Sequence, residues 1–164
     1  MKLPITSADM LSFLNAFFGF LAIIFSSEKS FFYAAIFMIA AVVMDMADGR
    51  VARFSKNSNE MGKNIDSLAD VVSFGIAPAF FFYMMISDFG IVAYLPFLLV
   101  IGGIYRLARF NISKSDCFIG MPITANGFII PFFYFLNFLN IYTIIVLSFV
   151  LSVGMVSRIK IRKL

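Results

Sequence analysis

The sequence contains no histidine or tryptophan and only one cysteine, Cys117. The absence of histidine excludes Ser-His catalytic triads, His-ligated zinc and acid–base catalysis by imidazole. A lone cysteine forms neither an internal disulfide nor a thiolate metal cluster. Charged residues are also scarce, at 13% against about 25% in soluble globular proteins. Any catalysis must therefore use carboxylates, hydroxyls, Lys, Arg, backbone groups or a metal held by oxygen ligands.

Hydrophobic residues, by contrast, make up 62% of the 164 residues, and phenylalanine alone occurs 23 times. A soluble domain of this size cannot bury that much apolar surface, because its surface-to-volume ratio is too high. The composition therefore predicts a membrane protein with one domain over residues 1–164. The net charge of +4 is attributed to membrane topology and anionic lipid head groups, and no nucleic-acid partner is expected.

Six apolar segments are long enough to be membrane-spanning helices, since about 17–25 residues cross a bilayer. Breaks that contain Ser, Asn, Asp and Gly separate them. The fifth and sixth segments form a nearly continuous apolar run, so the break between them is the weakest. The expected spans cover residues 8–26, 30–54, 64–86, 91–112, 122–138 and 140–157. These segments predict an all-α membrane protein built as a bundle of six transmembrane helices.

The basic residues are distributed unevenly over the loops of this arrangement. Twelve of the 13 Lys and Arg residues would lie on one side of the membrane, and only Lys29 on the other. The positive-inside rule makes the basic side cytoplasmic, with both termini on it. A five-span arrangement would move the basic C-terminal tail outside, which disfavours it. The protein is therefore expected in the cell membrane with both termini in the cytoplasm.

Four aspartates fall within or at the ends of two predicted spans, where a charged side chain costs about 2.5–3.5 kcal/mol at the helix centre. Asp45 and Asp48 lie three residues apart on the second helix and share a face. Asp66 and Asp70 lie four residues apart at the start of the third helix and form another face. A short connection makes the two helices antiparallel neighbours, so these faces are expected to meet.

Carboxylates that converge in this way repel one another strongly unless cations neutralise them. Oxygen-only ligands select hard ions, so Mg²⁺ or Mn²⁺ is preferred over Zn²⁺. Two such ions close together clamp a phosphoryl group during in-line displacement. The same acids also fit a protein of another class, a small transporter in which they line a pathway for protons or cations. The spacing alone leaves both interpretations open.

The aspartates belong to a longer string, D-M-A-D-G-R-V-A-R from Asp45 to Arg53, followed after eight residues by G-K-N-I-D-S-L-A-D from Gly62 to Asp70. It resembles the signature of the CDP-alcohol phosphatidyltransferases, D-x-x-D-G-x-x-A-R-(x8)-G-x-x-x-D-x-x-x-D, and matches all eight fixed positions. The resemblance covers essentially the whole chain, since the family core is six transmembrane helices. It implies transfer of a lipid phosphoryl group from a CDP-linked lipid to an alcohol, two divalent cations as cofactors, and a homodimer.

The resemblance also implies roles for the residues of the string. The expected metal ligands are Asp45, Asp48, Asp66 and Asp70. The expected CDP-lipid contacts are Gly49, Ala52, Arg53, Asn59 and Gly62. Asp70 is also the position of the general base for the incoming alcohol, and Arg53 would pair with the lipid pyrophosphate through its planar fork. The two glycines and Ala52 would let the nucleotide approach the backbone.

The first predicted span departs from the family pattern. Relatives often carry Pro-Asn near its start, with a Thr three residues later, in contact with the CDP-lipid. This chain has Ala8-Asp9 and Ser12 at these positions. An Asp beside a pyrophosphate is unfavourable unless it faces a metal, a cytosine amine or water, so Asp9 is retained as a candidate nucleotide contact.

Three further strings concern the acceptor. Segments 67–79, 105–111 and 118–124 resemble the third helix, the end of the fourth helix and the following F-x-G-x-P loop of small phosphatidylserine synthases and archaetidylserine synthases. They favour serine over glycerol-3-phosphate or an inositol phosphate. Arg106 and Arg109 share a helix face, as a site for the serine carboxylate requires, although anchoring at the cytoplasmic surface is an alternative role. The strings do not distinguish diacylglycerol from archaeol tails.

Overall fold

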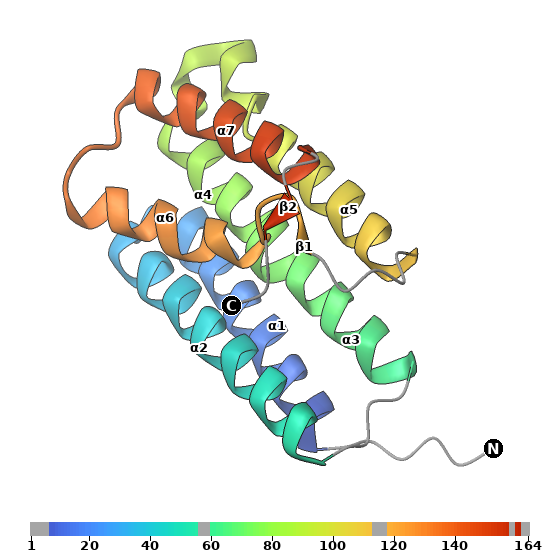
Figure 1. Ribbon diagram of the computed structural model, residues 1–164. Coiled ribbons are helices and arrows are strands. Elements are labelled where there is room, and N and C mark those ends of the chain that lie inside the picture. The colour runs from blue at the N-terminus through green and yellow to red at the C-terminus, as the bar shows by residue number, and fades with distance from the viewer. Residues whose placement is uncertain (1–6, 56–59, 113–117, 158–159, 162–164) are drawn as a thin grey trace.

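The computed structural model describes residues 7–55, 60–112, 118–157 and 160–161, and within these ranges the chain is almost entirely helical. The first two helices, α1 (Ser7–Ser27) and α2 (Phe31–Ser55), run antiparallel along one side of the bundle (Figure 1). A tight turn joins them, in which Lys29 has a positive φ of 57°. Small side chains let helices of this kind approach closely. Fully buried alanines on the pair are Ala22, Ala34, Ala35 and Ala41.

The helix that follows passes through the middle of the bundle (Figure 1). It consists of α3 (Glu60–Asp70), the π-helical turn η1 (Val71–Ile76) and α4 (Ala77–Met85). Its three parts contact α1, α2, α5 and α6 between them. This central helix is more buried than the other three long apolar helices, which explains why its outer half is apolar on nearly every face.

The second half of the chain covers the other side of this central helix. The 3₁₀ segment η2 (Ser87–Tyr94) leads into α5 (Phe97–Ile112), and α6 (Thr124–Phe135) precedes α7 (Ile141–Val156). Helix α7 packs on α5. The two-residue strands β1 (Phe118–Ile119) and β2 (Lys160–Ile161) pair antiparallel, so the segment before α6 is joined to the segment after α7.

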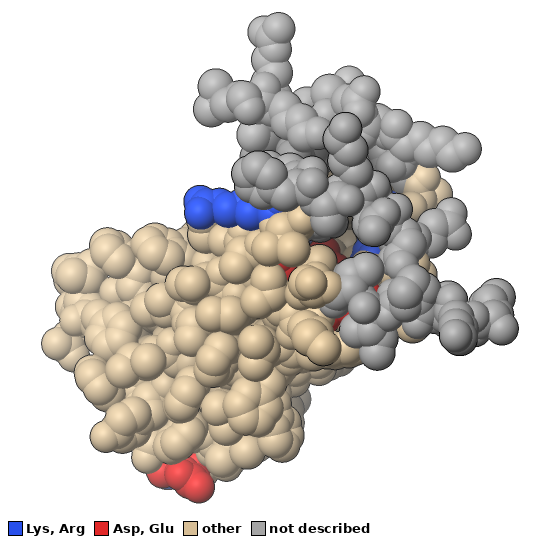
Figure 2. Space-filling view, turned by 90° about the horizontal axis from the view of Figure 1, so that it is seen from below, with Lys and Arg blue, Asp and Glu red and all other residues tan. Residues whose placement is uncertain are grey.

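The surface of the described residues is strongly apolar. Figure 2 shows that most of the face in view carries neither acidic nor basic side chains. Large hydrophobic residues are exposed on α1 at Phe17 and Phe20 and on α7 at Phe149 and Val150. A soluble monomer rarely exposes apolar area on this scale, whereas a lipid-facing surface requires it.

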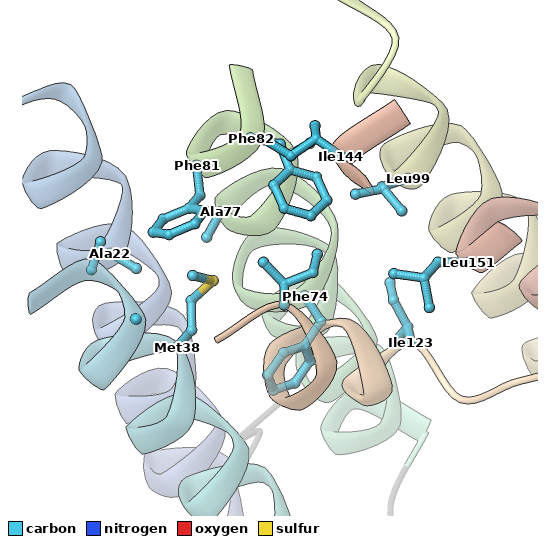
Figure 3. Close-up of a cluster of buried hydrophobic side chains, with 14 of the residues drawn as sticks. Ala22, Met38, Phe74, Ala77, Phe81, Phe82, Leu99, Ile123, Ile144 and Leu151 are labelled. Carbon is cyan, nitrogen blue, oxygen red and sulfur yellow. The ribbon is translucent and has the colours of Figure 1, made fainter. Parts of the chain in front are cut away.

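The core lies where the central helix meets its neighbours (Figure 3). Phe74 in η1 and Phe81 and Phe82 in α4 are fully buried, and Met38 of α2 and Ile123 beside α6 complete the cluster. Gly127 on α6 makes this packing possible, because a Cβ there would lie 2.6 Å from Cδ1 of Phe74. The core therefore fixes the central helix on the side of α6 as well as on the side of α2.

The prediction of six apolar helices in an all-α fold agrees with the described structure in number, with α3, η1 and α4 forming a single helix. Among the described residues, four helices are long and apolar enough to cross a membrane: Ser7–Ser27, Phe31–Val51, Met61–Met85 and Ser87–Ile112. The predicted spans 122–138 and 140–157 correspond to the shorter helices α6 and α7. The break between these two is well defined, since Asn137 takes a positive φ of 56° and Asn140 caps α7 by accepting a 3.0 Å hydrogen bond from the Thr143 N–H.

Candidate active site

Aspartate side chains from two helices meet where the end of α2 faces α3. Asp45 and Asp48 come from α2 and Asp66 from α3, and one carboxylate oxygen of each lies within 4.8 Å of the other two. Asp70, one turn beyond Asp66, interacts electrostatically with Asp45 and Asp66. The helical spacing accounts for this arrangement, because each pair of acids projects from one face of its helix. The structure thus brings together all four aspartates that the sequence singled out.

Helix α1 supplies two polar partners to this cluster. The Ser12 hydroxyl donates a 2.8 Å hydrogen bond to Asp48 Oδ2, and the Asn15 amide donates a 3.3 Å hydrogen bond to Asp70 Oδ1. Asp9, Ser12 and Asn15 recur every third residue and are all buried on the same helix. Sequence reasoning gave no role to Asn15. The periodic polar stripe in an otherwise apolar helix is the signal that identifies it.

The donor set fits a hard divalent cation. The Asp45, Asp48 and Asp66 cluster presents only carboxylate oxygens, which are the ligands that Mg²⁺ and Mn²⁺ prefer. Asp66 Oδ1 is buried and has no hydrogen-bond partner among the described residues. A buried carboxylate oxygen without a donor is energetically costly, and a bound cation removes that cost. Figure 2 views the molecule from below, and acidic atoms, drawn in red, lie recessed in the face that it shows.

The residues expected to contact the nucleotide lie beside the cluster. At Gly49, one residue after Asp48, an added Cβ would meet nothing within 4 Å among the described atoms, so the space over this backbone is open. Gly62 is half-buried, two turns before Asp70 on α3. Ala52 and Arg53 belong to the last turn of α2, but their side chains are outside the described part of the structure, as is all of residue 59, the expected contact Asn59.

Arg106 on α5 faces the aspartates. Its side chain is buried, interacts electrostatically with Asp70 and Asp45, and leaves its Nε without a hydrogen-bond partner among the described residues. The guanidinium also lies over the Phe110 ring, 5.9 Å from the centroid, and Lys63 Nζ lies 5.0 Å from the same centroid. A buried donor without a partner next to an acidic cluster has the properties of a binding group for an anionic part of a ligand.

Arg109 has different surroundings, although it lies only one turn away on α5. Its Nη1 donates to the Val156 carbonyl at 3.1 Å, and its Nη2 donates to the Met155 and Ser157 carbonyls at 3.3 and 3.1 Å. These carbonyls belong to the C-terminal end of α7, where they have no partner within the helix. Gly120, with a φ of +82°, packs against this contact, because a Cβ there would lie 2.8 Å from Nη2. Arg109 therefore joins α5 to the end of α7.

A second pair of side chains links α3 and α5 close to Arg106. The Asn111 amide donates a 3.1 Å hydrogen bond to Ser67 Oγ, and the Ser67 hydroxyl lies 3.4 Å from Asn111 Oδ1. Sequence reasoning placed both residues in strings typical of serine-transferring relatives but gave neither a role. In the structure they hold the two helices together on the side of the cluster that Arg106 faces.

Comparison with known proteins gives consistent matches. The chain matches the family model "CDP-alcohol phosphatidyltransferase" over residues 5–158. It is 40% identical over 158 residues to an archaetidylserine synthase of Methanothermobacter thermautotrophicus, covering 93% of this chain and 67% of that protein. It is 35% identical over 161 residues to a CDP-diacylglycerol–serine O-phosphatidyltransferase of Methanocaldococcus jannaschii, covering 97% and 75%. A Helicobacter pylori protein of the same name is 40% identical over 117 residues, covering 68% and 49%.

The chain thus spans between about half and three quarters of the length of these relatives. The matched region contains α1, the acidic faces of α2 and α3, and the buried arginine of α5. All eight fixed positions of the signature are present within it, and its four aspartates converge in the structure. On these grounds the chain belongs to the CDP-alcohol phosphatidyltransferase family, a family of membrane transferases of phospholipid synthesis.

Proposed function

We propose that this chain transfers a phosphatidyl-type group from a CDP-linked lipid to the hydroxyl of L-serine and releases CMP. The observation that carries the proposal is the meeting of Asp45, Asp48, Asp66 and Asp70 beside the buried guanidinium of Arg106. Relatives named as serine transferases support the choice of serine. The names of these relatives include both an archaetidylserine synthase and CDP-diacylglycerol–serine transferases. The assay below therefore compares donors with the two kinds of lipid tail.

The four aspartates would hold two divalent cations, Mg²⁺ or Mn²⁺. When bound, such cations stabilise negative charge on the phosphates of the donor and on the departing CMP. The chain contributes the carboxylates and the contacts that orient them. Ser12 fixes the carboxylate of Asp48 and Asn15 that of Asp70 through the hydrogen bonds from α1.

Binding of the CDP-lipid is assigned to the segment between the two acidic faces. The open space over Gly49 would admit the nucleotide against the backbone, and Ala52 and Gly62 would keep the neighbouring surface free of bulk. Arg53 would pair with the pyrophosphate and Asn59 with the nucleotide. The lipid tails would lie against the apolar outer surface of the helices.

Asp70 would act as the general base. Its carboxylate takes the proton of the serine hydroxyl, and the serine oxygen attacks the phosphorus on the lipid side of the pyrophosphate. A new P–O bond to serine forms, the P–O bond to CMP breaks, and its electron pair leaves with CMP. The burial of Asp70 and its contact with Asn15 hold the base in one orientation.

The serine carboxylate would be bound by Arg106, whose Nε has no other partner among the described residues. A guanidinium fork matches a carboxylate in geometry as well as in charge. Arg109 would take part in acceptor binding indirectly. Because its hydrogen bonds connect α5 to the carbonyls at the end of α7, Arg109 would keep Arg106 in position beside the aspartates.

The proposed setting is the cell membrane, with the aspartates at the cytoplasmic interface and both termini in the cytoplasm. The excess of Lys and Arg in the loops on that side supports this orientation. A soluble amino-acid acceptor and a membrane-bound donor would then meet at the surface of the bilayer. A homodimer is proposed from the family resemblance.

The deciding experiment measures CMP release by the purified full-length chain with CDP-diacylglycerol or CDP-archaeol, with and without serine. Serine-dependent CMP release supports the proposal, and the better of the two donors identifies the tails. Release with glycerol-3-phosphate or an inositol phosphate, and not with serine, would keep the family and overturn the acceptor. Cation uptake into vesicles without any CMP release would favour the transporter interpretation.

A further inference from the structure

The central helix stops being α-helical immediately after Asp70. The six residues Val71–Ile76 form a π-helical turn, in which the Ala77 N–H donates to the Val72 carbonyl five residues earlier. π-Helical turns are rare and occur frequently at functional sites. Here the turn directly follows Asp70, the residue that the proposed function makes the general base.

Helix α1 holds one side of this turn. The Ser73 hydroxyl donates a 2.8 Å hydrogen bond to the backbone carbonyl of Asn15, whose side-chain amide in turn donates to Asp70 Oδ1. The contact is close, because a Cβ on Gly19 would lie 2.6 Å from Ser73 Cα. Asn15 thus connects the turn directly to the carboxylate of Asp70.

Helix α6 holds the other side. In an α-helix the Phe74 carbonyl accepts a hydrogen bond from the N–H of residue 78, but this residue is proline and has no N–H. The amide of Asn126 donates a hydrogen bond to the Phe74 carbonyl at 2.9 Å. Asn126 and Phe74 are both fully buried, and Gly127 lets α6 approach the Phe74 ring.

We propose that Asn126 is a positioning residue for Asp70 and acts through the π-helical turn. By satisfying the Phe74 carbonyl, Asn126 stabilises the turn in the geometry that presents Ser73 to α1. That contact keeps the Asn15 amide on the carboxylate of Asp70. Without the Asn126 donor, the turn loses its hydrogen bond to α6, and Asp70 loses its fixed direction toward the acceptor hydroxyl. The inference rests on the proposed function, since it assigns Asp70 the role of base.

The test compares Asn126→Leu, which preserves size and removes the donor, with Ser148→Ala. Ser148 is a matched control because it is also buried, but its hydroxyl donates to the Ile144 carbonyl of its own helix. The concentration of active sites that bind nucleotide is measured by Mn²⁺-dependent binding of CDP. The rate of CMP release is then divided by this concentration. Asn126→Leu is expected to lower kcat per site roughly 10- to 100-fold, the scale of a misplaced catalytic group. CDP affinity and the KM for CDP-lipid should change much less than kcat, because Asp45, Asp48 and Asp66 still hold the cations. Ser148→Ala should leave all of these values unchanged.

Ser73→Ala provides a second route to the same turn. It is expected to lower kcat per site, and the Ser73→Ala/Asn126→Leu double variant should lose less than the product of the two single losses, because both act on one element. An unchanged kcat per site in Asn126→Leu overturns the proposal, as does full multiplicativity of the two losses. If Asn126→Leu does not fold, the Ser73→Ala value decides in the same way. A wild-type chain that binds CDP and releases no CMP with serine would refute the proposed function itself.

Discussion

Replacement of Arg106 by lysine is the sharpest test of the acceptor site. The change keeps a positive charge at a buried position but removes Nε and the planar fork. Nε is the atom that has no partner among the described residues, and the guanidinium is adjacent to Asp70 and Asp45. If this group binds the carboxylate of serine, Arg106→Lys removes one charge-assisted hydrogen bond to the acceptor and none to the donor lipid.

The expected size follows from the burial of the side chain, which is 8% exposed. A hydrogen bond to a charged group contributes about 1.5–3 kcal/mol. Because each 1.4 kcal/mol is about a factor of ten, the KM for serine should rise roughly 10- to 150-fold. The KM for CDP-lipid should change by less than about threefold, since an interaction with one substrate only is being removed.

The assay is CMP release with each substrate varied in turn. Arg50→Lys is the control, because Arg50 lies on the exposed surface of α2 and occupies a variable position of the signature. Arg109→Lys is a second comparison: its fork bonds carbonyls of α7, so this change should lower the thermal stability and raise the KM for serine less than Arg106→Lys does. An equal rise in both KM values for Arg106→Lys would refute the assignment and would place this arginine on the pyrophosphate.

Asp70→Asn should abolish CMP release while CDP-lipid binding remains, whereas Asp45→Asn should weaken binding of Mn²⁺ and of CDP together, as measured by titration. In oriented vesicles, Cys117 should react with a membrane-impermeant thiol reagent only from the cytoplasmic side, and the Ser87→Cys variant in a Cys117→Ser background only from the outside. Gly127→Ala places a Cβ 2.6 Å from Phe74 Cδ1 and should lower the free energy of unfolding by about 1–3 kcal/mol, seen as a lower Tm in detergent.

Each of these predictions has a contrary outcome. Near-normal turnover in either aspartate variant would refute two-metal catalysis with Asp70 as the base. Labelling of both thiols from the same side would contradict the six-span arrangement. Gly49→Ala is the counterpart of Gly127→Ala: its Cβ meets nothing within 4 Å among the described atoms, so it should keep the Tm and reduce only CDP-lipid affinity. A Tm loss equal to that of Gly127→Ala would show that the open space at Gly49 is filled by protein.

The acidic cluster was predictable because it depends on local rules. Spacings of three and four residues place Asp45 with Asp48, and Asp66 with Asp70, on shared helix faces, and a short connection makes the two helices neighbours. The number of apolar helices was predictable for a similar reason, since their composition alone separates them from the loops. The exact C-terminal end of α6 was not predicted, because it depends on the positive φ of Asn137.

Contacts between distant segments could not be predicted in this way. Arg106 and Arg109 look equivalent by spacing, but their surroundings differ because the end of α7 lies against only one of them. The role of Asn126 depends on a carbonyl 52 residues away. The periodicity of a sequence shows which residues share a helix face, but it does not show which neighbouring helix that face contacts.

The π-helical turn also has a consequence for how this chain tolerates sequence change. Successive residues of an α-helix are 100° apart, and a π-helical turn contains one residue more than an α-helical one. The faces of α4 are therefore rotated relative to those of α3. The carboxylates of α3 can point to the nucleotide while Phe81 and Phe82 of α4 point to the core, although both belong to one continuous helix. A substitution on the outer half therefore acts first on the packing around Phe81 and Phe82, and one on the inner half acts first on the carboxylates.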